Sequence, residues 1–497
     1  MSLLNEPSGT NKIPFYALLT SIFLLICRVG LFFLPLNDST EARYGEIARK
    51  MLETGNWVTP MQDYGVPFWA KPPLSFWLSA FSMKCFGVNE FAARLPSLFF
   101  SMGVLWLVFY TAKKMNPSAA AMTAVFILAS SLAFFFDAGA VMTDASLLFS
   151  CTLTLVAFWE AVVEKKQSWR YWFFVGLGLG LLAKGPLVIV LTGMPIFLWV
   201  LFHHEWRALW KNLPWFKGSL LLLLIALPWY LWAEHRTPGF LRYFILGEHF
   251  GRFLQSGWQG DKYGYAHSEP LGMIWIMLSM GMLPWTPGVL IWLCKHATKI
   301  PSLCRLNRGW MSYWFLCWLT PLLFFTFAKN IIWPYILPSM PAFALLSAAI
   351  YHYTVESILL SKRVIIIAAS SAFVYTATLS IVWFFEPVFV DVYVTKSQKP
   401  VIAFWKDQHP SPNSNLIYWT HQSRPFFSAQ FYSAGVAKVS DNPVTLNALL
   451  SNHEDNYLIT NSAENLAIPN AVLPRMRKIN SNQSGDGTFV LYRVMAM

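Results

Sequence analysis

The chain has 497 residues, of which 56% are hydrophobic and only 12% are charged. Soluble domains carry about 25% charged residues, so the composition excludes an ordinary soluble protein and predicts a chain that lies largely in lipid. The net charge of +12 does not indicate nucleic-acid binding, because Lys and Arg lie mainly in short loops between apolar segments. The six Cys residues show no CxxC spacing, which argues against a disulfide framework or a zinc ribbon.

About eleven apolar segments are candidate membrane-spanning helices, two of them short enough to be tilted or partly re-entrant. The first is too long for a signal peptide and lacks a clear cleavage site, so we interpret it as a retained helix. The candidates are Pro14–Leu36, Pro96–Thr111, Ser118–Phe136, Ala145–Val163, Tyr171–Leu182, Leu187–Leu201, Gly218–Trp232, Leu271–Leu293, Trp310–Phe327, Trp333–Ile350 and Val364–Phe385.

Basic residues recur in every second loop, as with Lys113 and Lys114 and then Lys165 and Lys166. Short cytoplasmic loops are enriched in Lys and Arg, so these loops and the N-terminus are predicted to face the cytoplasm. The intervening loops and the C-terminus are then predicted to face outward.

The first of these outward loops opens with the charged run "NDSTEARYGEIARKMLETGNW". Apolar residues recur at helical spacing from Tyr44 to Leu52, which predicts an amphipathic helix in the membrane interface that stops near Gly55. The two carboxylates at its start have a simple structural interpretation. Asp38 would cap the helix and Glu41 would favour its positive end.

Further ionisable side chains occur later in this loop and in the other outward loops, where charge beside lipid is costly. Each alone could be a helix cap or an interfacial anchor, but their accumulation at one membrane face indicates a functional site. Cations there suit a phosphate or pyrophosphate headgroup, and a carboxylate can act as general base on an acceptor hydroxyl or amine. These residues are Lys71, Asp137, Asp144, Lys184, Glu248, His249, Arg252 and Lys329.

The sequence changes character after Phe385. Short apolar runs such as "NLIYW", "NYLIT" and "FVLYRV" alternate with a helical pattern in "NPVTLNALLSN", which predicts a small α/β domain outside the membrane. We therefore expect a membrane domain at 1–386 and a C-terminal domain at 387–497.

The ordered motifs resemble those of multispanning glycosyltransferases with lipid-linked donors, the GT-C type. This type includes the aminoarabinose transferases of lipid A and bacterial relatives of the protein mannosyltransferases. The resemblance covers about Asp38 to Pro341 and rests on "TEARYGEIARKMLETGNWVTP", "AKPPLSFW", "MTDASLLF", "GLGLLAKGPL", "TPGFLRYFILGEHFGRF" and "AKNIIWPYILP". It implies a polytopic helical fold with two interfacial helices in the first outer loop. It also implies a bacterial inner-membrane location, an undecaprenyl-phosphate-linked sugar donor, and an acceptor such as lipid A at a periplasmic active site.

The resemblance also implies roles for particular residues in an inverting transfer. Asp38 is the first candidate for the base and Glu41 the second, because Thr40 occupies the family's Asp position. Lys71 and Arg252 would hold the donor phosphate, with Lys184 and Lys329 as weaker candidates, and Asp144 would orient the acceptor or share the base role. Further site candidates are Arg43, Tyr44, Glu248, His249 and Tyr335.

The zinc site of the aminoarabinose transferases is not predicted for this chain, and no other cofactor is predicted. Their Glu before the Lys-Pro pair is replaced by Ala70, which leaves His249 without a carboxylate partner, and a lone His is a poor zinc site.

Several functions stay open at this point. A protein O-glycosyltransferase of the mannosyltransferase type, or a transferase with a non-sugar donor, would use the same charges. A lipid flippase would place charges near the bilayer midplane within repeated halves, a pattern that the sequence does not show. A non-catalytic assembly protein would tolerate loss of Asp38 and Lys71. The sequence does not name the sugar or distinguish lipid A, core, O-antigen and protein as acceptors.

Overall fold

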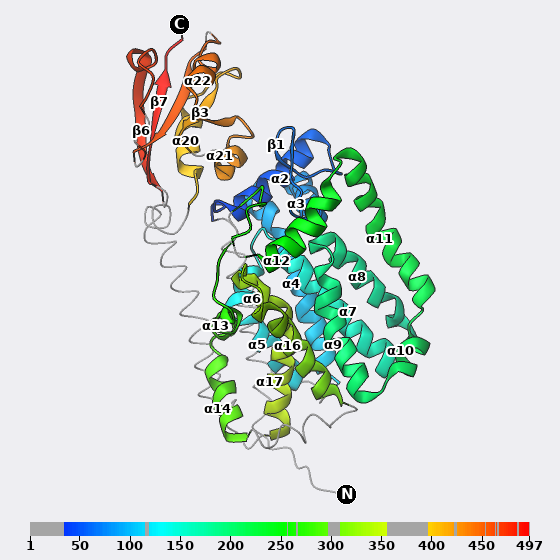
Figure 1. Cartoon of the computed structure of the whole chain (residues 1–497). Coiled ribbons are helices and arrows are strands. Elements are labelled where there is room, and N and C mark those ends of the chain that lie inside the picture. Colours follow the sequence, from blue (N-terminus) through cyan, green and yellow to red (C-terminus); the bar gives the residue numbers. More distant parts are fainter. Residues whose placement is uncertain are drawn as a thin grey trace, which may run out of the picture.

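The computed structural model describes residues 34–496, apart from 115–118, 256, 265–266, 297–308, 355–395, 422–424, 453, 463, 465–466 and 485–486. The predicted span Val364–Phe385, and all but the end of Pro14–Leu36, lie outside the described residues. Helices make up most of the chain up to residue 354, and a sheet with short helices follows from residue 396 (Figure 1).

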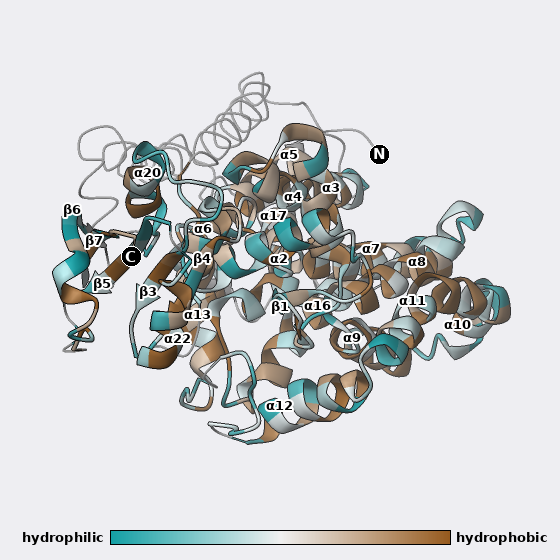
Figure 2. Cartoon of the chain, turned by 90° about the horizontal axis from the view of Figure 1, so that it is seen from above, coloured by the Kyte–Doolittle hydropathy of each residue, from teal (hydrophilic) through white to brown (hydrophobic). Residues whose placement is uncertain are grey.

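Among the described residues, four helical segments are long and apolar enough to cross a membrane. Apolar side chains on α11 stand exposed, including Phe216, Leu224 and Leu231, and apolar residues dominate α8, α9 and α11 in Figure 2. Such a surface is stable only in lipid, so the chain is a multispanning membrane protein. The four segments are α4 (Glu90–Ala112), α7 with η3 (Asp144–Phe158, Trp159–Val163), α11 (Trp215–Arg236) and η8 with α17 (Trp333–Ser339, Met340–Thr354).

Three further helices coincide with predicted segments, and a short one, α10 (Trp206–Asn212), joins α9 to α11. In α8 and α9 the close packing depends on glycine, because a Cβ at Gly180 would lie 2.6 Å from the Cβ of Val188. These helices are α8 (Arg170–Lys184), α9 (Leu187–His203) and α16 (Trp310–Thr326).

Two predicted spans are not single helices. Ser118–Phe136 is divided into α5 (Ala119–Ala129) and α6 (Leu132–Asp137), where the hydroxyl groups of Ser130 and Ser131 donate to carbonyls of the preceding turn. Leu271–Leu293 is divided into α13 (Met273–Gly281) and α14 (Thr286–His296), bent by 111°. Pro284 stands at that bend and has no amide hydrogen to continue a helix. Apolar length therefore predicted where helical residues occur but not whether each helix is continuous.

The first long loop contains two helices, as the resemblance implied, and a small hairpin between them. The helix α2 is amphipathic and ends at Gly55, whose φ of 67° is the left-handed conformation that glycine adopts readily. Its apolar face packs on α3 through Tyr44, Ile47 and Phe76. The elements are α2 (Thr40–Thr54), β1 (Met61–Asp63), β2 (Val66–Pro67) and α3 (Leu74–Phe86).

The C-terminal part is a five-stranded mixed sheet of order β4-β3-β5-β7-β6. Strands β3, β4 and β5 are parallel, whereas β7 is antiparallel to β5 and β6. Apolar clusters cover both faces of the sheet. The elements are α20 (Lys399–Asp407), β3 (Leu416–Trp419), α21 (Phe427–Tyr432), β4 (Ala437–Ser440), α22 (Pro443–Leu449), β5 (Asn456–Asn461), η10 (Leu473–Arg475), β6 (Met476–Ser484) and β7 (Gly487–Val494). The three apolar runs of the sequence form β3, β5 and β7, and the helical pattern forms α22.

Candidate active site

A cavity of about 1070 Å³ lies where the helical part meets the C-terminal part. Its wall comes from the start of α2, the loops before α3 and α7, the end of α8, the loops near residues 261 and 330, and the segment 425–427. Eight of the predicted site residues line it: Asp38, Arg43, Tyr44, Lys71, Asp144, Lys184, Arg252 and Tyr335. The tertiary structure thus gathers residues that are up to 297 positions apart.

A chain of ion pairs holds the two predicted phosphate ligands in place. The Glu248 carboxylate accepts from Lys71 Nζ at 3.2 Å and from Arg252 Nη1 at 3.0 Å, and Arg252 Nη2 lies 3.1 Å from Asp261 Oδ2. Burial alone would raise the pKa of Glu248, but Lys71 and Arg252 outweigh it and lower that pKa below its ordinary value. Glu248 is therefore a charged support for both cations.

Both cations keep donor capacity beyond these pairs. The Arg252 Nε–H is buried and has no acceptor among the described residues. The Lys71 ammonium has three N–H donors, and its recorded partners are Glu248 and the carbonyl of Ala70. An anion in the cavity would supply the remaining acceptors.

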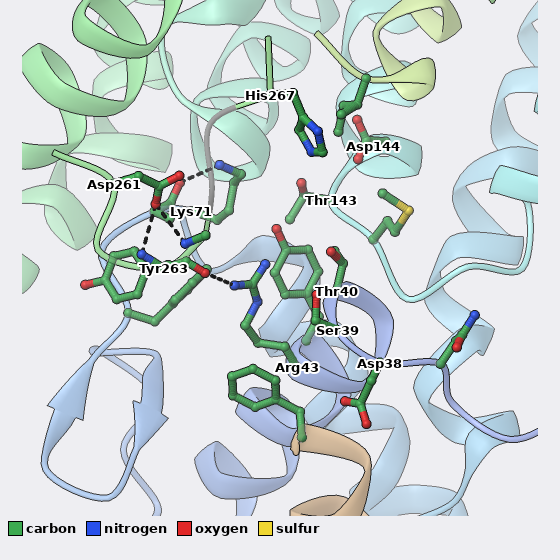
Figure 3. A pocket seen from close by; sticks show the side chains of 18 of the residues that line it. Asp38, Ser39, Thr40, Arg43, Lys71, Thr143, Asp144, Asp261, Tyr263 and His267 are labelled. Atoms are coloured by element: carbon green, nitrogen blue, oxygen red, sulfur yellow. Dashed lines mark hydrogen bonds between the residues drawn. The ribbon is translucent and has the colours of Figure 1, made fainter. Parts of the chain in front are cut away.

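A second ion pair joins Asp144, at the start of α7, to Lys184, at the end of α8. The Lys184 Nζ lies 2.5 Å from Asp144 Oδ1 and 4.9 Å from the centre of the Tyr335 ring. Both charged side chains are buried. Asp144 is thus paired with a cation, and Figure 3 shows it well separated from Asp38, near the top of the view with Asp38 near the bottom.

Asp38 does not cap α2, so the simple structural interpretation of this residue is wrong. The residue before α2 is Ser39, which makes no capping bond with its side chain. The Asp38 carboxylate instead accepts from both the amide and the hydroxyl of Ser428 in α21, while still lining the cavity.

Glu41 lies away from the cavity. Its two carboxylate oxygens accept from Arg94 Nε at 2.8 Å and Arg94 Nη2 at 2.9 Å, and the amides of Asn37 and Val141 also donate to them. Burial would raise the pKa of Glu41, but Arg94 and these amides lower it overall. Glu41 therefore ties α2 to α4, and we leave it out of the proposed base role.

Two more candidates take positions outside the cavity wall. Lys329 is exposed, whereas the next residue, Asn330, is buried and lines the cavity. The ring nitrogens of His249 face the carbonyl oxygens of Phe244 and Lys184, at 2.8 and 3.2 Å. Burial lowers the pKa of His249, and both ring nitrogens lie against backbone carbonyl groups outside the cavity lining.

Sequence reasoning missed several wall residues. Asp261 orients Arg252, and the Tyr263 carbonyl accepts from Arg43 Nη1 at 2.5 Å. Thr143 and Asn330 are nearly fully buried, and Thr143 Oγ1 and Asn330 Nδ2 have no hydrogen-bond partner among the described residues. Thr143 and Asn330 are uncharged polar residues, which are common in loops. Their only signal in the sequence was that each lies next to a predicted site residue, Asp144 and Lys329.

Comparisons with known proteins agree with this geometry. Residues 16–244 match the family of dolichyl-phosphate-mannose-protein mannosyltransferases. An undecaprenyl phosphate-alpha-4-amino-4-deoxy-L-arabinose arabinosyl transferase of Erwinia tasmaniensis is 33% identical over 344 residues, which are 67% of this chain and 59% of that protein. The chain therefore matches little more than half the length of this relative.

Solved structures extend the likeness to the whole fold. ArnT from Cupriavidus metallidurans, in a crystal structure bound to undecaprenyl phosphate, has a TM-score of 0.75 at 17% identity, over 98% of both chains. An Archaeoglobus fulgidus oligosaccharyltransferase has a TM-score of 0.51 at 9% identity, over 92% of this chain and 70% of that one. The resemblance inferred from the motifs is confirmed: the chain has the fold of the multispanning glycosyltransferases of the aminoarabinose transferase and protein mannosyltransferase type.

Proposed function

We propose that the chain is an inverting glycosyltransferase that moves a sugar from a polyprenyl phosphate to an acceptor. The observation that carries the proposal is the cavity itself. It combines Lys71 and Arg252, which keep unused donors, with the carboxylate of Asp38. The names of the similar proteins, which act on or bind undecaprenyl phosphate compounds, support undecaprenyl phosphate as the carrier.

In the proposed step, the acceptor oxygen attacks the anomeric carbon while the bond from that carbon to the phosphate oxygen breaks. The polyprenyl phosphate leaves with the bonding electrons, and the acceptor proton passes to Asp38. Lys71 and Arg252 stabilise the charge that develops on the phosphate. Because Glu248 and Asp261 already orient these cations, little reorganisation is needed as the charge develops.

Thr143 and Asn330 are proposed to bind hydroxyl groups of the sugar. Each has a buried polar atom without a partner among the described residues, and sugar hydroxyls can both donate and accept. The Asp144–Lys184 pair beside Thr143 is proposed to orient the sugar or the acceptor.

We propose that the cavity, the intervening loops and the C-terminal domain face the periplasm of an inner-membrane protein. An odd number of spans, about eleven in the prediction from sequence, would give this arrangement together with the alternation of basic loops. Reporter fusions after Lys114 and after Phe385 should give opposite orientations. A same-side result would contradict this topology.

Zinc has no place in the proposed mechanism. Ala70 offers no ligand atom, both ring nitrogens of His249 face carbonyl oxygens, and Glu248 binds two cations. No group of three His, Cys, Asp or Glu residues suited to a metal occurs among the described residues. Stoichiometric zinc in the purified protein, with loss of transfer after chelation, would contradict this part of the proposal.

The proposed acceptor is lipid A or another part of lipopolysaccharide. Mass spectrometry of lipopolysaccharide and glycoproteins from a deletion strain and its complemented parent tests this. A sugar missing from lipopolysaccharide alone supports the proposal, whereas a sugar missing from proteins indicates the protein O-glycosyltransferase. Transfer by the purified protein, with release of undecaprenyl phosphate, separates an enzyme from a flippase or an assembly protein.

A further inference from the structure

The carboxylate of Asp38 is held by a residue 390 positions away in the chain. The Ser428 amide donates to Asp38 Oδ1 at 3.0 Å, and the Ser428 hydroxyl donates to Asp38 Oδ2. Ser428 is fully buried in α21. One residue of the C-terminal part therefore engages both carboxylate oxygens of the candidate base.

The direction of the Ser428 hydroxyl is set by a third residue. The backbone N–H of Gln398 donates to Ser428 Oγ at 2.9 Å. A hydroxyl has one proton to donate, so a serine oxygen that accepts from Gln398 directs that proton at Asp38. Gln398 is itself fully buried, and its side-chain oxygen accepts from Tyr418 of β3. The serine is thus aligned by the framework of the C-terminal sheet.

Alternate residues of α21 fasten the helix to the first long loop. Gln430 accepts from Lys50 Nζ at 3.0 Å, and the Tyr432 hydroxyl donates to Glu90 at 2.9 Å. Lys50 is fully buried at this contact. Together with the bonds from Ser428 to Asp38, these bonds join α21 to three points of the first long loop, at residues 38, 50 and 90.

We propose that Ser428 is a positioning residue for the Asp38 carboxylate, so that the C-terminal part completes the active site. This inference rests on the proposed function, in which Asp38 accepts the acceptor proton. The two bonds from Ser428 would fix the orientation of this carboxylate on the cavity wall.

Removing the serine hydroxyl should raise the pKa of Asp38. A hydrogen bond to the charged form of a carboxylate lowers its pKa, so its loss raises that pKa. The other ionisable groups near Asp38 are Glu41 and Arg43 on its own segment, and Lys396, Tyr418 and His421 on the C-terminal part. Because substitution of Ser428 alters none of these groups, a shift of the acid limb toward higher pH is the result expected from loss of the hydrogen bond.

The experiment compares Ser428→Ala with Ser433→Ala in the full-length protein. Ser433 is buried at the end of the same helix and donates to Gln430 rather than Asp38. Transfer from undecaprenyl phosphate-linked aminoarabinose, and from the mannose analogue, to lipopolysaccharide would be followed against pH. For Ser428→Ala we expect kcat to fall about tenfold or more, since bonds to charged groups are the stronger ones. KM should stay near the wild-type value, and the acid limb of the kcat profile should move to higher pH.

Ser433→Ala should keep the wild-type kcat and acid limb, and Ser428→Thr should restore both. In an Asp38→Asn background, Ser428→Ala should cause little further loss. If Ser428→Ala does not reach the membrane, Ser428→Cys replaces it, because a thiol keeps the size but is a weak donor.

An unchanged kcat and acid limb in Ser428→Ala would overturn the positioning role, as would an equal loss in Ser433→Ala. If Asp38→Asn is inactive in the same assay, the proposed function would stand even though Ser428 does not position the base. Wild-type transfer by Asp38→Asn would instead remove the base from the proposed function, and the positioning role with it.

Discussion

The two walls of the cavity hold their carboxylates in different ways. On the wall built by the helical part, Glu248, Asp261 and Asp144 are each bound to Lys or Arg. On the wall that faces the C-terminal part, Asp38 is bound by the amide and hydroxyl of a serine. A cation lowers the pKa of a carboxylate more strongly than a neutral donor does. The ion-paired carboxylates therefore serve to place cations, whereas the bonds from Ser428 join the Asp38 carboxylate to the C-terminal part.

The largest expected effect comes from removing the serine-bound carboxylate. Asp38→Asn keeps an acceptor for Ser428 but loses the proton acceptor, so turnover should fall by at least about a hundredfold. Transfer by the purified, membrane-inserted protein measures this. Asp407→Asn, on the exposed face of α20, is the matched control and should behave as the wild type. Near-normal transfer by Asp38→Asn would show that the Asp38 carboxylate is not the proton acceptor.

The ion-paired wall is tested next through Arg252. Arg252→Ala removes a donor to the leaving phosphate, and the loss of one such donor costs about 10²–10³ in kcat. Arg242→Ala serves as control, since Arg242 is exposed on η5 (Arg242–Gly251), directly before the helix α12 (Arg252–Leu254) that begins with Arg252, and lies outside the cavity. If the two variants retain equal activity, Arg252 does not contact the phosphate. Binding of undecaprenyl phosphate to both variants shows whether the ground state is affected as well.

A smaller effect, on stability and not on chemistry, is expected at Glu41. Glu41→Gln leaves the buried Arg94 without its carboxylate, which should destabilise the protein by about 3–5 kcal/mol, seen as a lower Tm in detergent. Glu53→Gln is the control, because Glu53 is an exposed carboxylate on the same helix that also pairs with an Arg.

The pH dependence of this stability has a definite sign. Arg94 and two amides hold the pKa of Glu41 below its ordinary value in the folded protein. The stabilising contribution is therefore complete above the unfolded pKa, about 4.3, and is lost as pH falls through the folded pKa. The Tm advantage of the wild type over Glu41→Gln should be constant near neutral pH and shrink in acid. A collapse of kcat in Glu41→Gln with an unchanged Tm would instead move the base to Glu41.

The smallest effect is expected where neutral groups face the sugar. Thr143→Val removes one hydroxyl of nearly equal size, so the donor KM should rise about three- to tenfold with little change in kcat. Thr152→Val is the control, since Thr152 lies on the same helix and bonds the Leu148 carbonyl. A KM that is unchanged for every donor sugar would exclude Thr143 from the sugar site.

Much of the fold followed from composition and pattern. Apolar length located the helices of the membrane part, and alternation located β3, β5 and β7. Two spans were predicted as continuous although they are broken at Ser130–Ser131 and at Pro284, because hydropathy averages over such single residues. Gly55 was predicted correctly as a helix end, since its effect is local.

The site shows where sequence reasoning stops. By itself the sequence determined that Lys71, Arg252 and Asp38 are charged residues in otherwise apolar loops, and it predicted a site from them because charge beside lipid is costly whatever the fold. Only the tertiary structure placed Asp38 on the cavity wall and Glu41 away from it, although they are three residues apart. Glu41 meets Arg94, 53 positions away, and Asp38 meets Ser428, 390 positions away. Partners at such separations are selected by the packing of α2 against α4 and α21, which no local pattern of residues encodes.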